Sequence, residues 1–166
     1  MGSRTLAGAL LAAALLSGCG TVGSVGDAVD KTLGTAPQGT DATVNIAASP
    51  DANPDTGKRP SPVLVRIYQL KSTAALDQAD YFKLTGDPKA ALGDTLVSND
   101  QALVTPGQSR ALAVTLDPAT RMVGVVAGFR DIDRARWRTS VAVTPGTTRT
   151  VAIAVGAADV TAKAGE

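Results

Sequence analysis

The only cysteine of this 166-residue chain, Cys19, directly follows a short apolar run. A lone thiol has no partner for an internal disulfide, so its chemistry must be directed elsewhere. The run before it, residues 5–16, carries no charge and follows Arg4. It is shorter than the roughly 20 apolar residues that a helix needs to cross a bilayer. A basic residue, an apolar run and a small pair, Ser17-Gly18, are together typical of a secretory signal peptide.

The residues around the thiol indicate lipid attachment. Leu16-Ser17-Gly18-Cys19 resembles the bacterial lipobox, at which a diacylglyceryl group joins the cysteine sulfur. The leader, residues 1–18, would then be cut before Cys19, and the new amino group could also be acylated. Two or three acyl chains attach a protein durably, whereas one binds only marginally. The alternative is an ordinary secretory peptide with an accidental cysteine.

The residue after the thiol predicts where the anchor resides. Gly20 follows Cys19, and no aspartate stands there to retain the protein in the inner membrane. By resemblance to enterobacterial sorting rules, this points to the outer membrane, with the protein facing the periplasm.

Two carboxylates also deserve a test for acid–base chemistry, which paired carboxylates can perform. Asp131 and Asp133 lie two residues apart and would share one face of a strand. The arginines interleaved around them are Arg130, Arg134, Arg136 and Arg138. A solvated turn of ion pairs is therefore the simpler interpretation.

The rest of the chain argues against an enzyme. It contains no histidine, so the commonest general base and metal ligand is missing. It has no dinucleotide or phosphate-binding fingerprint, and no Cys/His cluster for zinc. We expect no enzymatic activity, no cofactor and no metal site.

Charge and composition also limit the partners. Cleavage would remove Arg4 and leave 15 basic residues facing 15 acidic ones, with no long charged block, so nothing favours nucleic acid. Aromatic residues are only 3% of the chain, so the core should consist of small and β-branched side chains.

Composition divides the chain into three segments. Residues 1–18 are the predicted signal peptide. Residues 19–41 are rich in Gly, Thr and Asp and are predicted to be a lipidated, flexible tether that reaches roughly 25 Å. Residues 42–166 carry strand patterns and are predicted to form one periplasmic β domain.

Three stretches carry the clearest strand patterns, namely residues 43–48, 63–70 and 121–130. The third is almost continuously apolar, as in a strand covered on both faces. Its two glycines, Gly124 and Gly128, would leave room for the bulk of Trp137.

A short helical insertion is expected after residue 70. Ser72 can cap a helix in which Ala75, Ala79 and Phe82 share one face. The Asp87-Pro88 pair should end that helix, and residues 89–96 carry no clear pattern.

An internal repeat supports an all-β fold. Residues 102–116 align without gaps on residues 141–155, and both place Thr-Pro-Gly between two alternating apolar runs, with arginine (Arg110, Arg149) three residues after the glycine. Proline followed by glycine favours a type II turn. Each copy is predicted to be a β-hairpin, either as a true repeat or as two unrelated hairpins. The predicted fold is a sandwich of 7–8 strands with a small helical insertion.

The connection between the first two strands is unusually long. Residues 49–62, SPDANPDTGKRPSP, are about twice as long as a common hairpin loop. Their four prolines reduce the entropy lost when a partner orders the loop. A projecting recognition loop and a tolerated surface insertion both remain open.

Several motifs now combine. The lipobox precedes a tether, Asn53-Pro54 leads to Gly-Lys-Arg-Pro, and PVLVRIYQLKS follows; then come LVTPG, VVAGFRDI and Trp137-Arg138. In this order, they resemble the outer-membrane lipoprotein of the type VI secretion system, the TssJ family. The resemblance covers roughly residues 42–160 and implies a transthyretin-like β-sandwich with a small helical addition.

The resemblance also implies a function. Family members dock the periplasmic C-terminal domain of a large inner-membrane subunit, of the TssM family, in a core complex that can hold a ring of copies. The loop between the first two strands contacts that partner. The candidate contact residues carried onto this chain are Asn53, Asp55, Gly57, Lys58 and Arg59. A buried Arg130–Asp131 pair, together with Trp137 and Arg138, would instead fix the edge of the sandwich.

Three functional hypotheses follow. The first is a structural, lipid-anchored secretion component. The second is a lipid-anchored periplasmic sandwich that binds a peptide or carbohydrate, which would need a concave, aromatic-lined site. The third is a periplasmic enzyme, which would need carboxylates that converge in a deep pocket.

Overall fold

The computed structural model describes residues 38–166, so the predicted signal peptide, Cys19 and most of the predicted tether lie outside the described residues. The strands are β1 (Thr40–Ala48), β2 (Val63–Leu70), β3 (Leu96–Val104), β4 (Ser109–Leu116), β5 (Met122–Ala127), β6 (Arg138–Ala142), β7 (Thr150–Val155) and β8 (Val160–Gly165). The helices are α2 (Ala74–Gln78), α3 (Tyr81–Gly86), α4 (Pro88–Leu92) and the 3₁₀ turn η1 (Gly93–Thr95).

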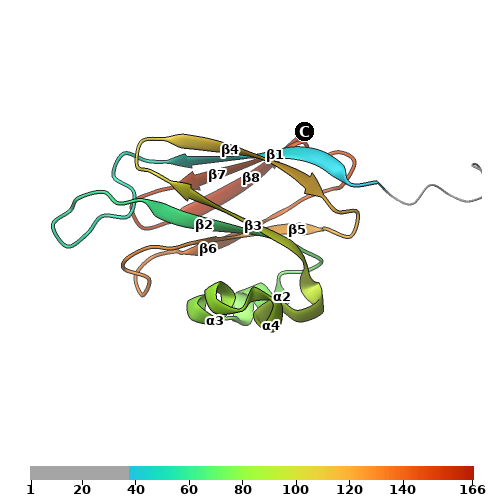
Figure 1. The fold of residues 1–166 in the computed structure, drawn as a ribbon, viewed down its shortest axis with the longest axis horizontal. Helices are drawn as coiled ribbons and strands as arrows, with labels where there is room; N and C mark the ends of the chain where they lie inside the picture. Colours follow the sequence, from blue (N-terminus) through green and yellow to red (C-terminus); the bar gives the residue numbers. More distant parts are fainter. Residues whose placement is uncertain (1–37) are drawn as a thin grey trace, which may run out of the picture. The chain divides into compact units, whose positions relative to one another are not determined.

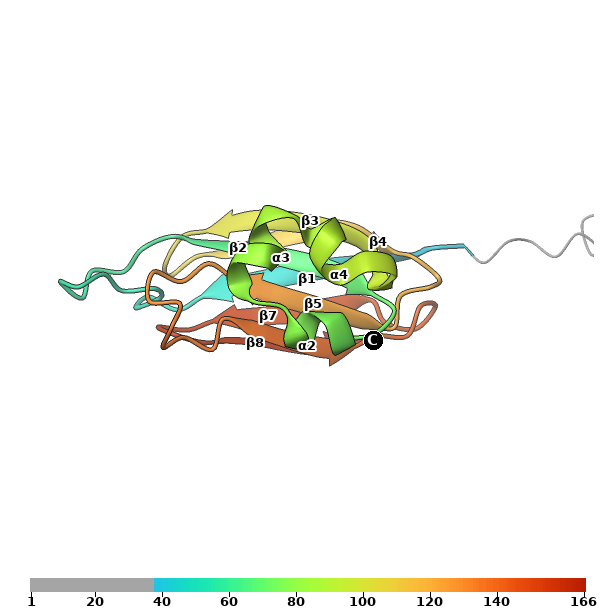
Figure 2. The ribbon, with the colours of Figure 1, turned by 90° about the horizontal axis from the view of Figure 1, so that it is seen from below.

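The eight strands form two four-stranded sheets that pack face to face (Figure 1). The strand order is β4-β1-β7-β8 in sheet A and β3-β2-β5-β6 in sheet B. β1 and β7 are parallel, and the other neighbouring pairs are antiparallel. The three helices lie against the outer face of sheet B (Figures 1 and 2). The predicted all-β sandwich with a small helical insertion is confirmed.

Small aliphatic side chains fill the space between the sheets. Alternate residues of each strand point inward, such as Val44 and Ile46 on β1, and Val65 and Ile67 on β2. This alternation is the period of two that a strand imposes on its side chains. The expected core of β-branched side chains is therefore present.

One buried polar residue ties the two sheets together. Gln69 on β2 points into the core side, and its Nε2 donates to the Thr115 carbonyl at 2.9 Å. Its Oε1 accepts from the Asp117 amide at 3.0 Å and from the Thr120 hydroxyl at 2.9 Å. Both the oxygen and the nitrogen of the Gln69 side-chain amide are hydrogen-bonded, so burying this amide costs little free energy.

The helical insertion differs from the prediction. It consists of three short helices, and Thr73 rather than Ser72 stands at the first N-cap, without a side-chain hydrogen bond. Asp87 and Pro88 begin α4 rather than only ending a helix, because the Asp87 carboxylate accepts from the Ala90 amide and proline suits the first helical position. Phe82 does not pack inward and is 72% exposed.

Leucines anchor the insertion instead. The residues buried between the helices and sheet B are Tyr68, Leu70, Leu76, Leu84, Leu92 and Val126. The Tyr68 hydroxyl donates to the Leu84 carbonyl at 2.8 Å. Burial raises the pKa of Tyr68, so it stays a neutral hydrogen-bond donor.

The two strand glycines make room for these helices rather than for Trp137. A Cβ atom on Gly124 would lie 2.8 Å from the Leu76 side chain, and one on Gly128 would lie 2.9 Å from the Tyr81 hydroxyl. Trp137 packs edge-on against Tyr81, with ring centroids 5.5 Å apart. The prediction was right that bulk fills the space and wrong about which side chains supply it.

The two Thr-Pro-Gly turns have the predicted geometry but another role. The Gln108 amide donates to the Thr105 carbonyl at 3.0 Å, and Gly107 and Gly146 have φ values of 73° and 93°, as type II turns require. However, β3 and β4 lie in different sheets, and so do β6 and β7. Each turn carries the chain from sheet B to sheet A, so the hairpin prediction was wrong.

The strands run between two ends of the sandwich. We call the end at which β1 begins the Thr40 end. The opposite end, the loop end, carries residues 49–62, 105–108, 128–137 and 156–159. In Figure 1, the 49–62 segment projects at the left, beyond the strands, whereas β1 begins at the right. β1 has nine residues, so the two ends are about 25–30 Å apart.

Candidate functional site

The long segment 49–62 is an ordered loop whose two arms bond to each other. The Ser61 amide donates to the Ala52 carbonyl at 3.0 Å, and the Asp55 amide donates to the Arg59 carbonyl at 2.9 Å. Ala52 is fully buried at the base of the loop. The loop thus stands on the sandwich as a stem with a turn, residues 55–59, at its tip.

Asp55 organises this tip. Its Oδ1 accepts from the amides of Gly57 at 2.8 Å and Arg59 at 2.9 Å. Its Oδ2 accepts from Nε of Arg59 at 2.9 Å and pairs with the same guanidinium at 2.8 Å. The backbone and side-chain donors of Arg59, helped by the Gly57 amide, hold the pKa of the Asp55 carboxyl below its usual value.

Asn53 joins the loop to neighbouring segments through a set of hydrogen bonds that we call the Asn53 clasp. Its side-chain Nδ2 donates to the Pro62 carbonyl at 3.0 Å, and its Oδ1 accepts from the Arg130 amide at 2.8 Å. Its own amide donates to the Ala157 carbonyl at 3.0 Å. Its φ of 51° lies in the left-handed region, where asparagine is better tolerated than most residues. Three of the connections at the loop end therefore meet at this one residue.

The five residues predicted from the resemblance separate into two groups. Gly57, Lys58 and Arg59 are exposed at the tip, and Asp55 lies half-buried behind them. Asn53 is only 4% exposed, so its side chain shapes the loop and is not displayed on it. Lys58, with a φ of 62°, is presented outward by the backbone of the turn.

The segment between β5 and β6, residues 128–137, lies beside this loop. The predicted strand face with Asp131 and Asp133 does not exist, because β5 ends at Ala127. The Ala135 amide donates to the Asp131 carbonyl at 3.0 Å, which makes a turn. Arg134 pairs with Asp131 at 3.5 Å with both side chains mostly in solvent, so the solvated ion-pair turn is confirmed.

The buried Arg130–Asp131 pair expected at this edge is absent, since both residues are exposed. Arg138 does the structural work there. Its Nη1 donates to the carbonyls of Leu76 at 2.9 Å and Ala79 at 2.8 Å, and its guanidinium lies 5.0 Å from the ring centroid of Trp137. It binds α2 to the edge strand β6.

An open hollow of about 480 Å³ separates the two loops. The residues that line it are Pro54, Asp55, Thr56, Arg130, Asp131 and Arg134. Three come from each loop, and five of the six carry polar or charged side chains. The hollow is thus a polar surface feature, and it has no aromatic lining.

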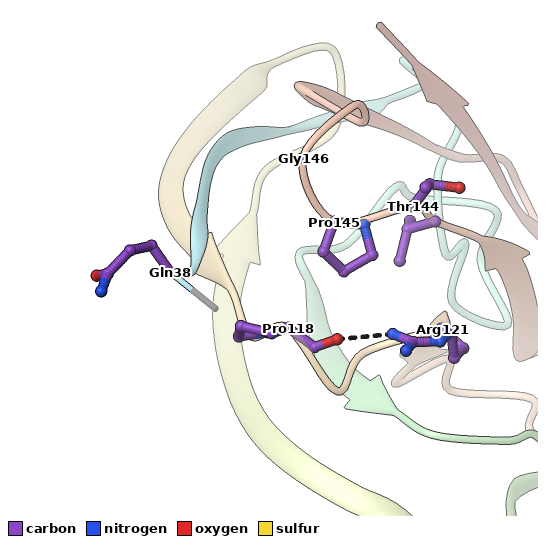
Figure 3. A pocket seen from close by; sticks show the side chains of 7 residues that line it. Gln38, Pro118, Arg121, Thr144, Pro145 and Gly146 are labelled. Carbon is purple, nitrogen blue, oxygen red and sulfur yellow. Dashed lines mark hydrogen bonds between the residues drawn. The ribbon is translucent and has the colours of Figure 1, made fainter. Parts of the chain in front are cut away.

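A second hollow, of about 570 Å³, lies at the Thr40 end (Figure 3). It is lined in part by Pro118, Arg121, Thr144 and Pro145. The Arg121 guanidinium is used within its own turn, where Nη1 donates to the carbonyls of Pro118 at 2.7 Å and Thr120 at 2.8 Å. This hollow also lacks aromatic side chains, which a peptide or sugar site would need.

Within residues 38–166, no cluster of three or more acidic, histidine or cysteine side chains is placed to hold a metal ion. Nor is any helix in this part of the chain long and apolar enough to cross a membrane. The described acids Asp131 and Asp133 lie on an exposed loop and do not converge in a deep pocket.

Sequence reasoning missed the clasp. Asn53 was assigned to partner contact, and its bond to the Arg130 amide joins residues 77 positions apart. The available signal was local, since an Asn-Pro pair at the base of a long loop often marks a turn. Gln69 was also missed, although it continues the inward-facing series of Val63, Val65 and Ile67 and is the one polar member.

Comparison with known proteins identifies the family. A family model of type VI secretion lipoproteins, which include VasD, EvfM and TssJ, matches residues 40–158. The crystal structure of the type VI secretion lipoprotein TssJ1 from Pseudomonas aeruginosa is 37% identical, with a TM-score of 0.72, and the match covers 77% of this chain and 98% of that chain.

Two further structures are similar. Lip of Serratia marcescens, a membrane-bound component of the type VI secretion system, is 26% identical with a TM-score of 0.68, over 75% of this chain and 96% of that one. A chain of the structure described as the TssM C-terminal domain from EAEC is 28% identical with a TM-score of 0.62, over 74% of this chain and 97% of that one.

No curated protein sequence matches this chain. The family model nevertheless spans seven of the eight strands of the sandwich, and the TssJ1 structure has the same fold with more than a third of its aligned residues identical. The chain therefore belongs to the TssJ family of type VI secretion lipoproteins, and its fold is the transthyretin-like β-sandwich of that family.

Proposed function

We propose that this chain is a structural lipoprotein of the type VI secretion membrane complex, which docks the periplasmic domain of a TssM-type inner-membrane subunit. The proposed contact is the 49–62 loop, with Asp55, Gly57, Lys58 and Arg59 at its tip. The match to a chain in a structure described as the TssM C-terminal domain supports the choice of partner. Several copies would surround one complex.

The observation that carries this proposal is that the chain's entry point and the 49–62 loop lie at opposite ends of the sandwich. The chain enters at Thr40, and the ordered loop projects from the opposite end, about 25–30 Å away (Figure 1). An anchor that precedes Thr40 would hold the first end toward the membrane. The loop then points into the periplasm, where an inner-membrane subunit can reach it.

The order of the loop tip favours docking for an energetic reason. When a partner binds a flexible loop, each loop residue that becomes ordered loses conformational entropy. Here the Asp55 carboxylate already fixes the tip through four contacts. Membrane attachment adds a high effective concentration of the domain near its partner. A small interface can therefore suffice.

The proposed role is structural, in keeping with the matched family of type VI secretion lipoproteins. The partner contact, and not a bound substrate, is what the exposed tip offers.

The proposed anchor is a lipid on Cys19, which would place the protein at the periplasmic face of the outer membrane. The lipobox and the similarity to a membrane-bound component support it. Substituting Cys19→Ser should move the protein from the membrane fraction to the soluble periplasmic fraction and stop secretion. Retention of the variant in the outer-membrane fraction would refute lipid attachment at this residue.

The docking surface can be tested by changing the two exposed cations of the tip. Arg59 also pairs with Asp55, so it is replaced by glutamine, which keeps an N–H donor for that carboxylate. The variant combines Lys58→Asn, since asparagine tolerates the left-handed backbone there, with Arg59→Gln. Residues 20–166 of each form are titrated against the periplasmic C-terminal region of the inner-membrane subunit from the same bacterium. Binding should weaken by about tenfold or more, because hot-spot residues dominate such interfaces.

The matched control is Lys163→Gln, which removes one exposed charge from β8 on the outer face of sheet A. It should bind like the unaltered domain. Thermal unfolding of all three proteins shows whether each is folded. Equal affinity of the tip variant and the control would rule out the loop as the docking site.

A further inference from the structure

The hollow between the two loops contains a cation that the fold does not use. Arg130 lies on the second loop, and its side chain is exposed. Its backbone amide donates to Oδ1 of Asn53 at 2.8 Å. Within residues 38–166, the guanidinium of Arg130 has no ion pair and no hydrogen bond.

The nearby carboxylates are already occupied. Both oxygens of Asp55 are taken by donors from Gly57 and Arg59. Asp131 pairs with Arg134 at 3.5 Å. Arg130 therefore acts on Asp55 only through space, where its charge contributes to the lowered pKa of that carboxyl. Its five N–H donors remain available to an incoming group.

The backbone that carries this cation is held in place. The Asn53 clasp holds the backbone of Arg130 against the base of the 49–62 loop, and Asn53 itself is held by Pro62 and Ala157. The two walls of the hollow therefore keep their spacing. A side chain that enters between Thr56 and Arg130 would meet an arginine whose backbone is already in place, so that binding has to order only the arginine side chain.

We propose that the docking surface spans both loops, and that the hollow between them receives the carboxylate of an Asp or Glu side chain of the partner, which Arg130 binds. This rests on the proposed docking function and extends it from the first loop to the second. Guanidinium and carboxylate match in geometry and can form two parallel N–H···O bonds. The kind of partner surface that fits is thus a protruding acidic residue.

The test uses substitutions that leave the clasp intact. Arg130→Ala removes the guanidinium but keeps the backbone amide that bonds to Asn53, so the fold should be unchanged. Residues 20–166 of this variant, of Arg130→Lys and of the control Lys163→Ala are titrated against the periplasmic C-terminal region of the cognate inner-membrane subunit, at low and at high salt.

The proposal predicts that Arg130→Ala weakens binding about tenfold at low salt and makes it less sensitive to salt, because one charge pair is lost. Arg130→Lys should fall between, since lysine keeps the charge but not the bidentate geometry. Lys163→Ala should bind normally.

Two contrary results are separable. If Arg130→Ala binds like the unaltered domain while the Lys58→Asn, Arg59→Gln variant fails, then the hollow receives no carboxylate and the first loop alone docks. If neither variant changes binding, the loop end is not the docking surface, and the proposed function falls together with this inference.

Discussion

At the scale of single residues, the loop end separates residues that build the surface from residues that present it. The side chains of Asn53 and Asp55 form hydrogen bonds that hold the loop in shape. Lys58 and Arg130 leave theirs in solvent. Residue type and a family resemblance predicted which stretch matters, but not this division, because burial depends on a clasp between residues 53 and 130 that no local pattern contains.

The Asp55 carboxylate makes the loop tip sensitive to acid. Its folded pKa lies below its ordinary value, mainly because the amide and side chain of Arg59 stabilise the charged form. The stabilisation is therefore present above the unfolded pKa of about 3.9 and is lost as the pH falls through the lower, folded pKa. We expect the 55–59 turn to stay ordered at pH 5 and to open only in stronger acid.

The measurement is an NMR titration that follows the Asp55 carboxyl carbon and the amides of Gly57 and Arg59. Their shifts should change together, with a midpoint below the ordinary aspartate value of about 3.9. In Asp55→Asn the acid-dependent change of the two amides should disappear. A midpoint at or above about 3.9, the ordinary value of an aspartate, would show that the carboxylate does not organise the tip.

At the scale of elements, the local sequence predicted the type of each turn better than it predicted which strands pair with each other. Proline and glycine in Thr105-Pro106-Gly107-Gln108 specify a type II turn, and the φ of Gly107 agrees. The turn does not specify whether the strands beside it pair with each other. In this fold they join different sheets, because β4 pairs with β1 and β3 pairs with β2, both far away in the sequence.

The helical insertion shows the same limit. Its existence was predictable, because the strand pattern stops after Leu70 and helix-capping residues follow. Its division into three short helices was not, since it depends on capping by Asp80 and Asp87 and on leucines that fit the outer face of sheet B. Gly124 allows that fit, because any larger residue would collide with Leu76.

At the scale of the whole molecule, the sandwich has two different ends. The chain enters at the start of β1, and the same strand leads directly into the proposed docking loop, residues 49–62, at the far end. The buried Gln69 joins the two sheets at the Thr40 end through Thr115, Asp117 and Thr120.

The overall fold class, the core composition and the long loop after the first strand were all predictable, since each follows from alternation, composition or length. That this loop docks a partner stays a prediction. The orientation of the loop was predictable too, because the loop directly follows the first strand and so lies opposite the chain's entry point. The position of residues 128–137 beside the loop was not predictable, because it depends on a contact between residues 77 positions apart.

The most direct test of the account is a hydrogen-exchange footprint of residues 20–166, free and bound to the periplasmic C-terminal region of the cognate inner-membrane subunit. The account predicts slower exchange at the loop end, in residues 49–62 and 128–137, and unchanged exchange at the Thr40 end, in residues 117–121 and 143–149. Protection confined to the Thr40 end or to the outer face of sheet A would contradict it.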